Sequence, residues 1–424
     1  MVFLLHNIKN LYGIAKDKYK ELGVNTDLAL IELKKISLSI HCWQGDDVGG
    51  FERPDSVITG GGILATGNYP GKARTIKELQ MDLSKAISLI PGNHRINLHA
   101  IYGDFGGNFV DRSEIKPIHF QTWIDWAKKE DLGIDFNSTL FSHPKAESGY
   151  TLSSKSPEIR NFWIEHVKRC REISVEIGKQ LNNKVTHNIW IPDGSKDTTV
   201  DRVGYRNRLK DSLDRIFEQE VDPKYIQDSL EGKLFGIGSE AFVVGSYDFY
   251  LSYAVKNTLM LTLDSGHFHP TESVGDKISA ILPFVNGILL HISRGLRWDS
   301  DHVVTLNDHV IEIAEEVIRS NILERFSIGL DYFDASINRI AAWIIGARST
   351  LKSLMYALLQ PWEILKSYEN NDQLFQRLAL LEELKSFPFG AVWDYYCFKQ
   401  NVPVGKDWII DVEEYEKTTL LKRS

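Results

Sequence analysis

Short apolar runs alternate along the chain with longer stretches in which apolar residues recur every three or four positions. A short apolar run bounded by turn residues predicts a buried β-strand. Eight such runs are present, at 36–43, 95–102, 132–137, 185–193, 225–231, 258–264, 287–293 and 326–333. The fifth run, YIQDSLE, is the weakest of them because it has little β-propensity.

The stretches between the runs have the period of amphipathic helices. The clearest are 73–90, 158–181 and 309–323, and Pro91-Gly92 ends the first. Repeated strand–helix units predict a parallel sheet with helices outside it, and eight units predict an α/β fold of the (β/α)8 TIM-barrel type.

The remaining segments predict additional helices at both ends of the barrel. Residues from about 7 to 34 form an N-terminal helical segment, which we include in a barrel domain of residues 1–350. Residues 351–424 form a C-terminal helical extension, and the segment 102–117 should be loop.

Charged, imidazole and indole side chains gather where the predicted strands end. They are His41, His99, Trp190, Asp193, Glu231, Lys233, Asp264, His267, His291, Asp299, Asp301 and Asp331. The amino-terminal ends of the strands show no such collection. Because the carboxyl ends of barrel strands form one rim, where the active sites of such barrels lie, this asymmetry predicts an active site there.

Seven of these residues are potential metal ligands. Five carboxylates and two imidazoles, with no cysteine, suit Mn²⁺, Mg²⁺ or Co²⁺ better than structural zinc. Seven ligands exceed the number that one octahedral ion needs when substrate oxygens also coordinate it, so two ions are expected. Asp299 and Asp301 are two residues apart and would face the same way on an extended segment, whereas His267 follows Asp264 by three.

Each motif alone also has an ordinary structural explanation. The two aspartates of WDSD could form a turn or a solvated pair, and the histidines of HFH could hydrogen-bond within a loop. His99 could be a satisfied core imidazole, and Trp190 could be packing. Only the joint pattern on one rim favours a metal site.

Charge and composition limit the partners of the protein. The 424 residues carry a net charge of −8 without a basic stripe, which disfavours a nucleic-acid partner. The longest apolar run in the C-terminal half, 340–347, is too short to span a bilayer, so no membrane partner is expected. The three cysteines form no CxxC motif, and a reducing cytosol fits them.

Several long strings carry a resemblance to a known family: HCWQGDDVGGFE (41–52), ATGNYPGKAR (65–74), NLHAIY (97–102), NIWIPDG (188–194), LDSGHFHPTE (263–272), RWDSDHV (297–303) and GLDYFDASINRIAAW (329–343). From about residue 37 to its end, the chain resembles the L-rhamnose isomerases. The resemblance implies a barrel of the xylose-isomerase-like type and the interconversion of L-rhamnose and L-rhamnulose, the first step of L-rhamnose catabolism. It also implies a cytoplasmic homotetramer.

The resemblance further implies two metal positions, filled by Mn²⁺ with Co²⁺ or Zn²⁺ as substitutes. A structural ion would be held by Glu231, Asp264, His291 and Asp331. A catalytic ion would be held by His267, Asp299, Asp301 and the substrate oxygens.

Roles for the remaining rim residues follow from the chemistry and from the resemblance. His99 is the candidate that moves a proton to the ring oxygen when the sugar ring opens. Lys233 would donate to a substrate oxygen, and Trp190 would form an apolar wall against the sugar. The resemblance favours a hydride shift in which Asp331 orients a metal-bound water, while the residues alone leave an enediol step open.

Three other functions compete with this prediction. A metal-dependent apurinic endonuclease on the same barrel would need a basic surface, against which the negative charge argues. A non-catalytic sugar-binding protein would not need seven metal-type ligands on one rim. Another aldose isomerase would differ only in its sugar.

Overall fold

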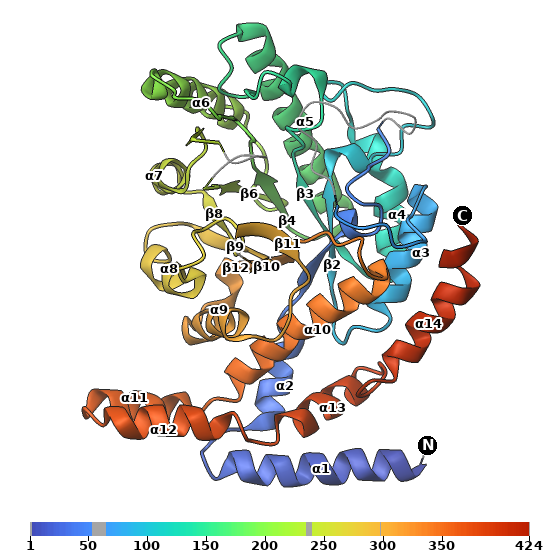
Figure 1. The fold of residues 1–424 in the computed structure, drawn as a ribbon, viewed down its shortest axis with the longest axis vertical. Helices are drawn as coiled ribbons and strands as arrows, with labels where there is room; N and C mark the ends of the chain where they lie inside the picture. The colour runs from blue at the N-terminus through green and yellow to red at the C-terminus, as the bar shows by residue number, and fades with distance from the viewer. Residues whose placement is uncertain (1, 53–64, 235–239, 297, 424) are drawn as a thin grey trace.

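A closed barrel of eight parallel strands forms the centre of the protein (Figure 1). The computed structural model describes residues 2–52, 65–234, 240–296 and 298–423, with the backbone alone for 2–6 and 298–300. Around the barrel the strands follow the order β1-β12-β9-β8-β6-β4-β3-β2. Their bounds are Leu38–His41 (β1), Arg95–His99 (β2), Gly133–Asn137 (β3), Val185–Ile189 (β4), Ile226–Glu231 (β6), Met260–Asp264 (β8), Gly287–Ile292 (β9) and Phe326–Leu330 (β12).

Each of the eight predicted runs contains one barrel strand, so the predicted fold class is confirmed. The weakest run, 225–231, forms β6 because its polar residues have partners on both sides of the sheet. Gln227 donates to Thr186 and Ser327 inside the barrel, while Asp228 binds Arg171 of a covering helix. Tertiary hydrogen bonds therefore override a low β-propensity.

Helices cover the outside of the barrel, and the N-terminal helix lies beside C-terminal helices on one side of it (Figure 1). They are α1 (Val2–Lys20), α2 (Thr26–Lys35), α3 (Ile76–Ile87), α4 (Gln121–Glu130), α5 (Pro157–Leu181), α6 (Arg202–Phe217), α7 (Tyr247–Asn257), α8 (Val274–Ile281), α9 (Asp308–Arg319), α10 (Arg339–Leu358), α11 (Trp362–Asn370), α12 (Leu374–Leu384), α13 (Phe389–Lys399) and α14 (Trp408–Thr418). Side-chain caps such as Asn25, Thr75 and Ser156 begin several of them.

The N-terminal and C-terminal helices pack on one another. Tyr12 of α1 stacks on Tyr395 of α13 with ring centroids 3.8 Å apart. Helix α10 follows the last barrel strand and continues through residue 350, where we placed the boundary of the C-terminal extension. Among the described residues, no helix is long and apolar enough to cross a membrane.

Charged residues also occur at the amino-terminal mouth of the barrel, so the asymmetry expected from the sequence is incomplete. Arg95 of β2 donates to both carboxylate oxygens of Asp135 on β3, at 2.8 Å each. Ser39 and the backbone N–H of Thr186 donate to the same carboxylate. Every oxygen of Asp135 is thus occupied, which is how a buried charge is tolerated in a structural role.

A Ser–His–Asp chain of hydrogen bonds lies behind the barrel wall. Ser138 is 2.9 Å from Nε2 of His187, whose Nδ1 is 2.8 Å from Asp228. Arg171 of α5 pairs with Asp228, and the Ser138 hydroxyl also meets Cys170 of α5. The arrangement therefore joins strands to a covering helix, and Ser138 at its end also lines a pocket at the carboxyl-terminal rim.

The buried His166 of α5 predicts a pH dependence of stability. Its Nε2 accepts from the Thr139 N–H and its Nδ1 donates to the Arg112 carbonyl, so both nitrogens suit a neutral ring. Burial lowers the pKa of His166 from 6.5 to about 3. Unfolding therefore takes up a proton, and the stability that His166 contributes is complete above pH 6.5 and lost as pH falls towards 3.

We expect His166→Gln to flatten the fall in stability below pH 6.5 by up to about 1.4 kcal/mol per pH unit, the value for one proton. Urea unfolding of both proteins between pH 6.5 and 4.5 measures this difference. Equal slopes for the two proteins would show that His166 is protonated in the folded state.

Candidate active site

Four adjacent strands bring four of the predicted ligands to one point on the carboxyl-terminal rim. Glu231 ends β6, Asp264 ends β8, His291 lies next to the end of β9, and Asp331 follows β12 directly. These strands are consecutive in the barrel order β12-β9-β8-β6, and Asp264 is in register with His291. Each of the four residues offers a ligand atom, and these atoms lie within 4.8 Å of one another.

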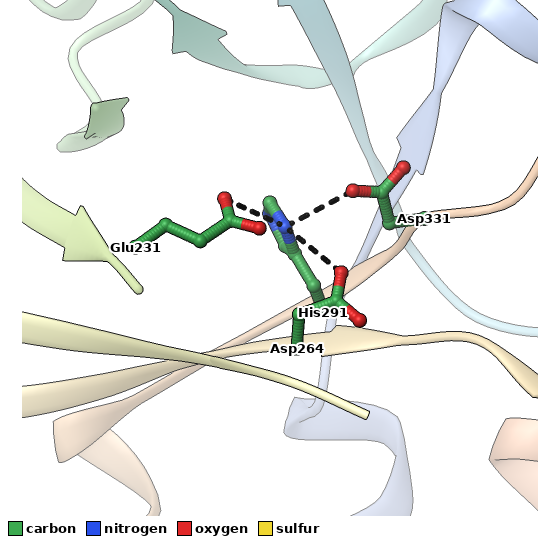
Figure 2. A group of neighbouring side chains, drawn as sticks. All are labelled: Glu231, Asp264, His291 and Asp331. Atoms are coloured by element: carbon green, nitrogen blue, oxygen red, sulfur yellow. Dashed lines mark ion pairs between the residues drawn. The ribbon is translucent and has the colours of Figure 1, made fainter. Parts of the chain in front are cut away.

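The imidazole of His291 stands among the three carboxylates (Figure 2). Its Nδ1 lies 3.3 Å from Asp331 Oδ2, 3.5 Å from Glu231 Oε2 and 3.9 Å from Asp264 Oδ2. In the described part of the chain, neither ring nitrogen of His291 has a partner with hydrogen-bond geometry. Three acids that converge on one ring nitrogen are the donor set of a hard or borderline divalent cation.

The electrostatics of the cluster favour charged groups in spite of burial. Burial raises the pKa of Glu231, but His291 and His267 more than offset it and hold that pKa well below its usual range. Burial likewise raises the pKa of Asp331, and His291 brings it below its usual value. For His291, burial lowers the pKa, yet Glu231 and Asp331 hold it well above its usual value. The site therefore concentrates negative charge away from water, where a bound cation would compensate it.

Protein donors hold one oxygen of each carboxylate. Nε1 of Trp43 donates to Asp331 Oδ1 at 3.0 Å, and the Gly266 N–H donates to Asp264 Oδ1 at 2.6 Å. In both residues the other oxygen, Oδ2, is the one near His291. Asn188 donates at 2.5 Å to Glu231 Oε2, the oxygen that also lies near His291. Such outer partners fix the orientation of metal ligands, so the residues present fit a divalent ion.

The second predicted ligand group is only partly described. Nδ1 of His267 lies 3.1 Å from Glu231 Oε1, beside the first cluster, and Asp301 lines the same pocket. The segment Trp298–His302 is a strand, β11, but Asp301 has a left-handed backbone (φ 44°) that interrupts its regular alternation. The side chain of Asp299 lies outside the described residues, so its role as a ligand stays a prediction.

The predicted substrate residues surround the same pocket. His99 of β2 lies across the barrel from Asp264 of β8, and Lys233 and Trp190 line the pocket with it. The Lys233 ammonium lies 5.1 Å from the centroid of the Trp190 ring. Nδ1 of His99 is 3.0 Å from the Thr139 hydroxyl, and burial lowers the pKa of His99 to about 4.

Two other rim residues have structural environments. Both carboxylate oxygens of Asp193 accept hydrogen bonds from Thr151 and Ser153, at 2.5 to 3.0 Å. His41 ends β1 and is fully buried with its ring edge-on to Tyr332, and it is not among the residues that line the pocket. A position at the end of a strand is therefore not sufficient for membership of the site.

Several pocket residues were not singled out from the sequence. They are Trp43, Val48, Asn137, Ser138, Phe141, Asn188 and Phe333. Asn188 lies within the predicted strand 185–193, two residues before Trp190, and strand alternation places both on the same face. That alternation was the available signal for Asn188. The pairing of Trp43 with Asp331 joins residues too far apart in sequence to be inferred locally.

Comparison with known proteins identifies the family. A family model described as L-rhamnose isomerase (RhaA) matches residues 6–423. The chain belongs to the L-rhamnose isomerase family. This confirms the resemblance seen in the sequence motifs.

Proteins named L-rhamnose isomerase match almost the whole chain. The protein from Mannheimia succiniciproducens is 54% identical over 99% of this chain and 100% of its own. Those from Bacteroides thetaiotaomicron and Listeria innocua serovar 6a are 53% and 52% identical, each over 98% of this chain and 99% of their own. A solved L-ribulose 3-epimerase has a TM-score of 0.49 and 11% identity, covering 76% of this chain and 95% of that one.

The geometry predicts that Glu231→Gln weakens cation binding. At a Mn²⁺ concentration of about 100 times the dissociation constant, binding should add about 2.7 kcal/mol to the stability of the wild type. The variant should lose most of the corresponding rise in melting temperature, because Glu231 is buried among the other ligands and contacts both imidazoles.

Asp193→Asn is the matched control, since it also neutralises a buried rim carboxylate, one whose oxygens are already occupied. The rise in melting temperature that Mn²⁺ causes in this variant should equal that in the wild type. Scanning calorimetry of the stripped and the Mn²⁺-loaded proteins provides the measurement. An undiminished rise in Glu231→Gln would remove Glu231 from the ligand set.

Proposed function

We propose that the protein interconverts L-rhamnose and L-rhamnulose in a metal-dependent aldose–ketose isomerisation. The observation that carries the proposal is the convergence of Glu231, Asp264, His291 and Asp331 on one rim. All of them except Asp264 line a pocket that also holds His99 and Lys233. Membership of the L-rhamnose isomerase family supports the choice of sugar. The reaction moves one hydrogen between C1 and C2 of the open-chain sugar and consumes no other reactant.

We propose Mn²⁺ as the ion, with Co²⁺ or Zn²⁺ as substitutes. Glu231, Asp264, His291 and Asp331 would hold a structural ion, and His267, Asp299 and Asp301 would hold a catalytic one. Divalent ions act as Lewis acids on neighbouring sugar oxygens and stabilise the negative charge that develops there during isomerisation. The mixed carboxylate and imidazole donors suit this choice of ion.

His99 is proposed to open the pyranose ring. Because its pKa is lowered to about 4, the imidazole is neutral near pH 7 and acts first as a base. When Nδ1 donates to Thr139, Nε2 is left as the acceptor. The imidazole of His99 takes the proton of the anomeric hydroxyl as the bond between C1 and the pyranose oxygen breaks. The imidazolium then passes the same proton to that oxygen.

Lys233 and Trp190 are proposed to hold the sugar in place. The ammonium of Lys233 is buried against the Trp190 ring and reaches the pocket, where it would donate to a sugar oxygen. The rings of Trp190 and Phe141 meet edge to face at 5.7 Å and form an apolar wall for the carbon face of the sugar. Asp331, fixed by Trp43, would complete the polar side of the pocket.

The competing functions fit the protein less well. An apurinic endonuclease needs a basic surface for the DNA backbone, and the net charge of −8 disfavours it. A sugar-binding protein does not need the acids and imidazoles of this rim. An isomerase acting on another aldose stays the nearest alternative, and a panel of aldoses distinguishes it.

We also propose a cytoplasmic homotetramer, on the strength of the family relationship. Exposed apolar side chains on α12, among them Leu374, Phe375 and Leu378, offer a surface that association would cover. The three cysteines are free and buried, which fits a reducing compartment.

The central prediction is metal-dependent ketose formation. Protein stripped with EDTA should convert L-rhamnose at a small fraction of the loaded rate, and added Mn²⁺ or Co²⁺ should restore turnover. His267→Ala should remain inactive in excess Mn²⁺ while keeping its fold, because His267 borders the pocket at the second ligand group. Full turnover in excess chelator, with no metal found by elemental analysis, would contradict the proposal.

His99→Asn tests the ring-opening step. Asparagine keeps a hydrogen-bonding group but cannot transfer the proton, so kcat should fall by roughly 10² to 10⁴, the usual worth of acid–base assistance. Metal content should not change. A purely structural histidine gives the opposite pattern, a lower melting temperature with a near-normal kcat, and measurement of all three quantities on one preparation separates the two.

A further inference from the structure

The loop after β1 contains two consecutive residues in an unfavourable backbone conformation. Asp47 and Val48 have φ angles of 56° and 60°, in the left-handed region. Asp tolerates this region, but a β-branched residue such as valine rarely adopts it, because its Cβ crowds the backbone. Such strain persists only where surrounding contacts impose it, and it gathers at functional sites.

Contacts on both sides of the turn hold it in this conformation. The preceding residue, Asp46, accepts hydrogen bonds from the Tyr102 hydroxyl and the Gly50 N–H, each at 2.7 Å. The N–H of Val48 donates to the Trp43 carbonyl at 3.0 Å. These bonds close the loop but leave the side chain of Asp47 to a different partner.

That partner is Arg339, the first residue of α10. Its Nε and Nη2 donate to the two carboxylate oxygens of Asp47 at 2.7 and 2.8 Å, a bidentate pair. Nη1 of Arg339 donates to the Tyr69 carbonyl at 2.6 Å. The Arg339 side chain is 5% exposed and that of Asp47 is 20% exposed, so the pair is largely shielded from water.

The turn carries Val48 into the wall of the active-site pocket. Val48 is buried and lines the pocket, together with the metal-site residues and His99, whereas Asp47 and Arg339 are not among the lining residues. A relaxation of φ at residues 47 and 48 would move the valine side chain away from this position. The shape of the pocket therefore depends on a pair that does not itself line it.

We propose that the Asp47–Arg339 ion pair is a positioning clamp for substrate binding, which holds the strained turn so that Val48 completes the pocket wall. This inference rests on the proposed isomerase function and adds two positioning residues to it. Neither residue is placed to touch the reacting atoms. The clamp raises the fraction of molecules whose pocket is ready to bind sugar.

The clamp makes a specific kinetic prediction. If its loss leaves about one molecule in ten with the turn in place, the apparent affinity for sugar falls by that fraction and KM rises about tenfold. This corresponds to about 1.4 kcal/mol. At saturating sugar the bound form regains the turn, so kcat should stay within about twofold. A defect in the chemistry would instead lower kcat.

Three substitutions at Asp47 separate the effect of the ion pair from the effect of the left-handed backbone conformation at that residue. Asp47→Ala removes the ion pair, and Asp47→Gly removes it while relieving strain at that residue. Asp47→Asn tolerates the left-handed region and keeps an oxygen that accepts from Arg339. With the Mn²⁺-loaded enzyme and L-rhamnose, we expect KM to rise about tenfold for Ala and Gly, and by less than about threefold for Asn.

Asp82→Ala is the matched control. Asp82 of α3 forms a buried bidentate pair with Arg423, at 2.6 and 2.8 Å, away from the pocket. Its loss should lower the melting temperature without changing KM. Hydrogen exchange over residues 42–52 adds a readout independent of activity, and it should become faster in Asp47→Ala but not in Asp82→Ala.

A wild-type KM in Asp47→Gly would overturn the proposal, since backbone conformation alone would then suffice. An equal rise in KM in Asp82→Ala would overturn it as well, because general loosening would explain both. Inactivity of the wild type on L-rhamnose with every metal tested would contradict the proposed function. In that case hydrogen exchange over residues 42–52 still tests the clamp. Unchanged exchange in Asp47→Ala overturns it, and faster exchange supports it.

Discussion

Three carboxylates held within a few ångströms of one imidazole, two of them buried and the third about one-fifth exposed, are the constraint around which the carboxyl-terminal rim is built. Glu231, Asp264 and Asp331 repel one another, and burial adds to the cost of their charge. Four adjacent strands nevertheless fix them there, and Trp43 and Asn188 hold their oxygens in place. A fold that maintains this arrangement provides a site whose natural complement is a divalent cation.

Hydrogen-bond occupancy distinguishes this cluster from the other buried acids of the barrel. The oxygens of Asp135 are filled by Arg95, Ser39 and a backbone N–H, and those of Asp193 by hydroxyls and backbone donors. Around His291, by contrast, acids face a ring nitrogen at 3.3 to 3.9 Å without hydrogen-bond geometry. Both kinds of acid are buried, so burial alone does not mark a ligand.

The sequence predicted the barrel well because its strands and helices have regular hydrophobic periods, which local packing enforces. It also placed Glu231, Asp264, His291 and Asp331 on one rim, since all four lie at the end of a strand or one residue from it. It could not separate Asp193 from them, because the Thr151 and Ser153 donors that satisfy Asp193 come from a distant loop. Equally, β6 was nearly missed because its polar residues gain their partners only in the folded protein.

The parts of the site that escaped prediction are those that depend on long-range contacts. Trp43 reaches Asp331 across 288 positions, and Arg339 reaches Asp47 across 292. Both contacts join the loop after β1 to the segment that follows β12, which closure of the barrel makes neighbours. One loop therefore orients a ligand carboxylate through Trp43 and shapes the pocket wall through Val48. Closure of the barrel thus joins the cluster of candidate metal ligands to the wall of the pocket, although their residues lie at opposite ends of the barrel sequence.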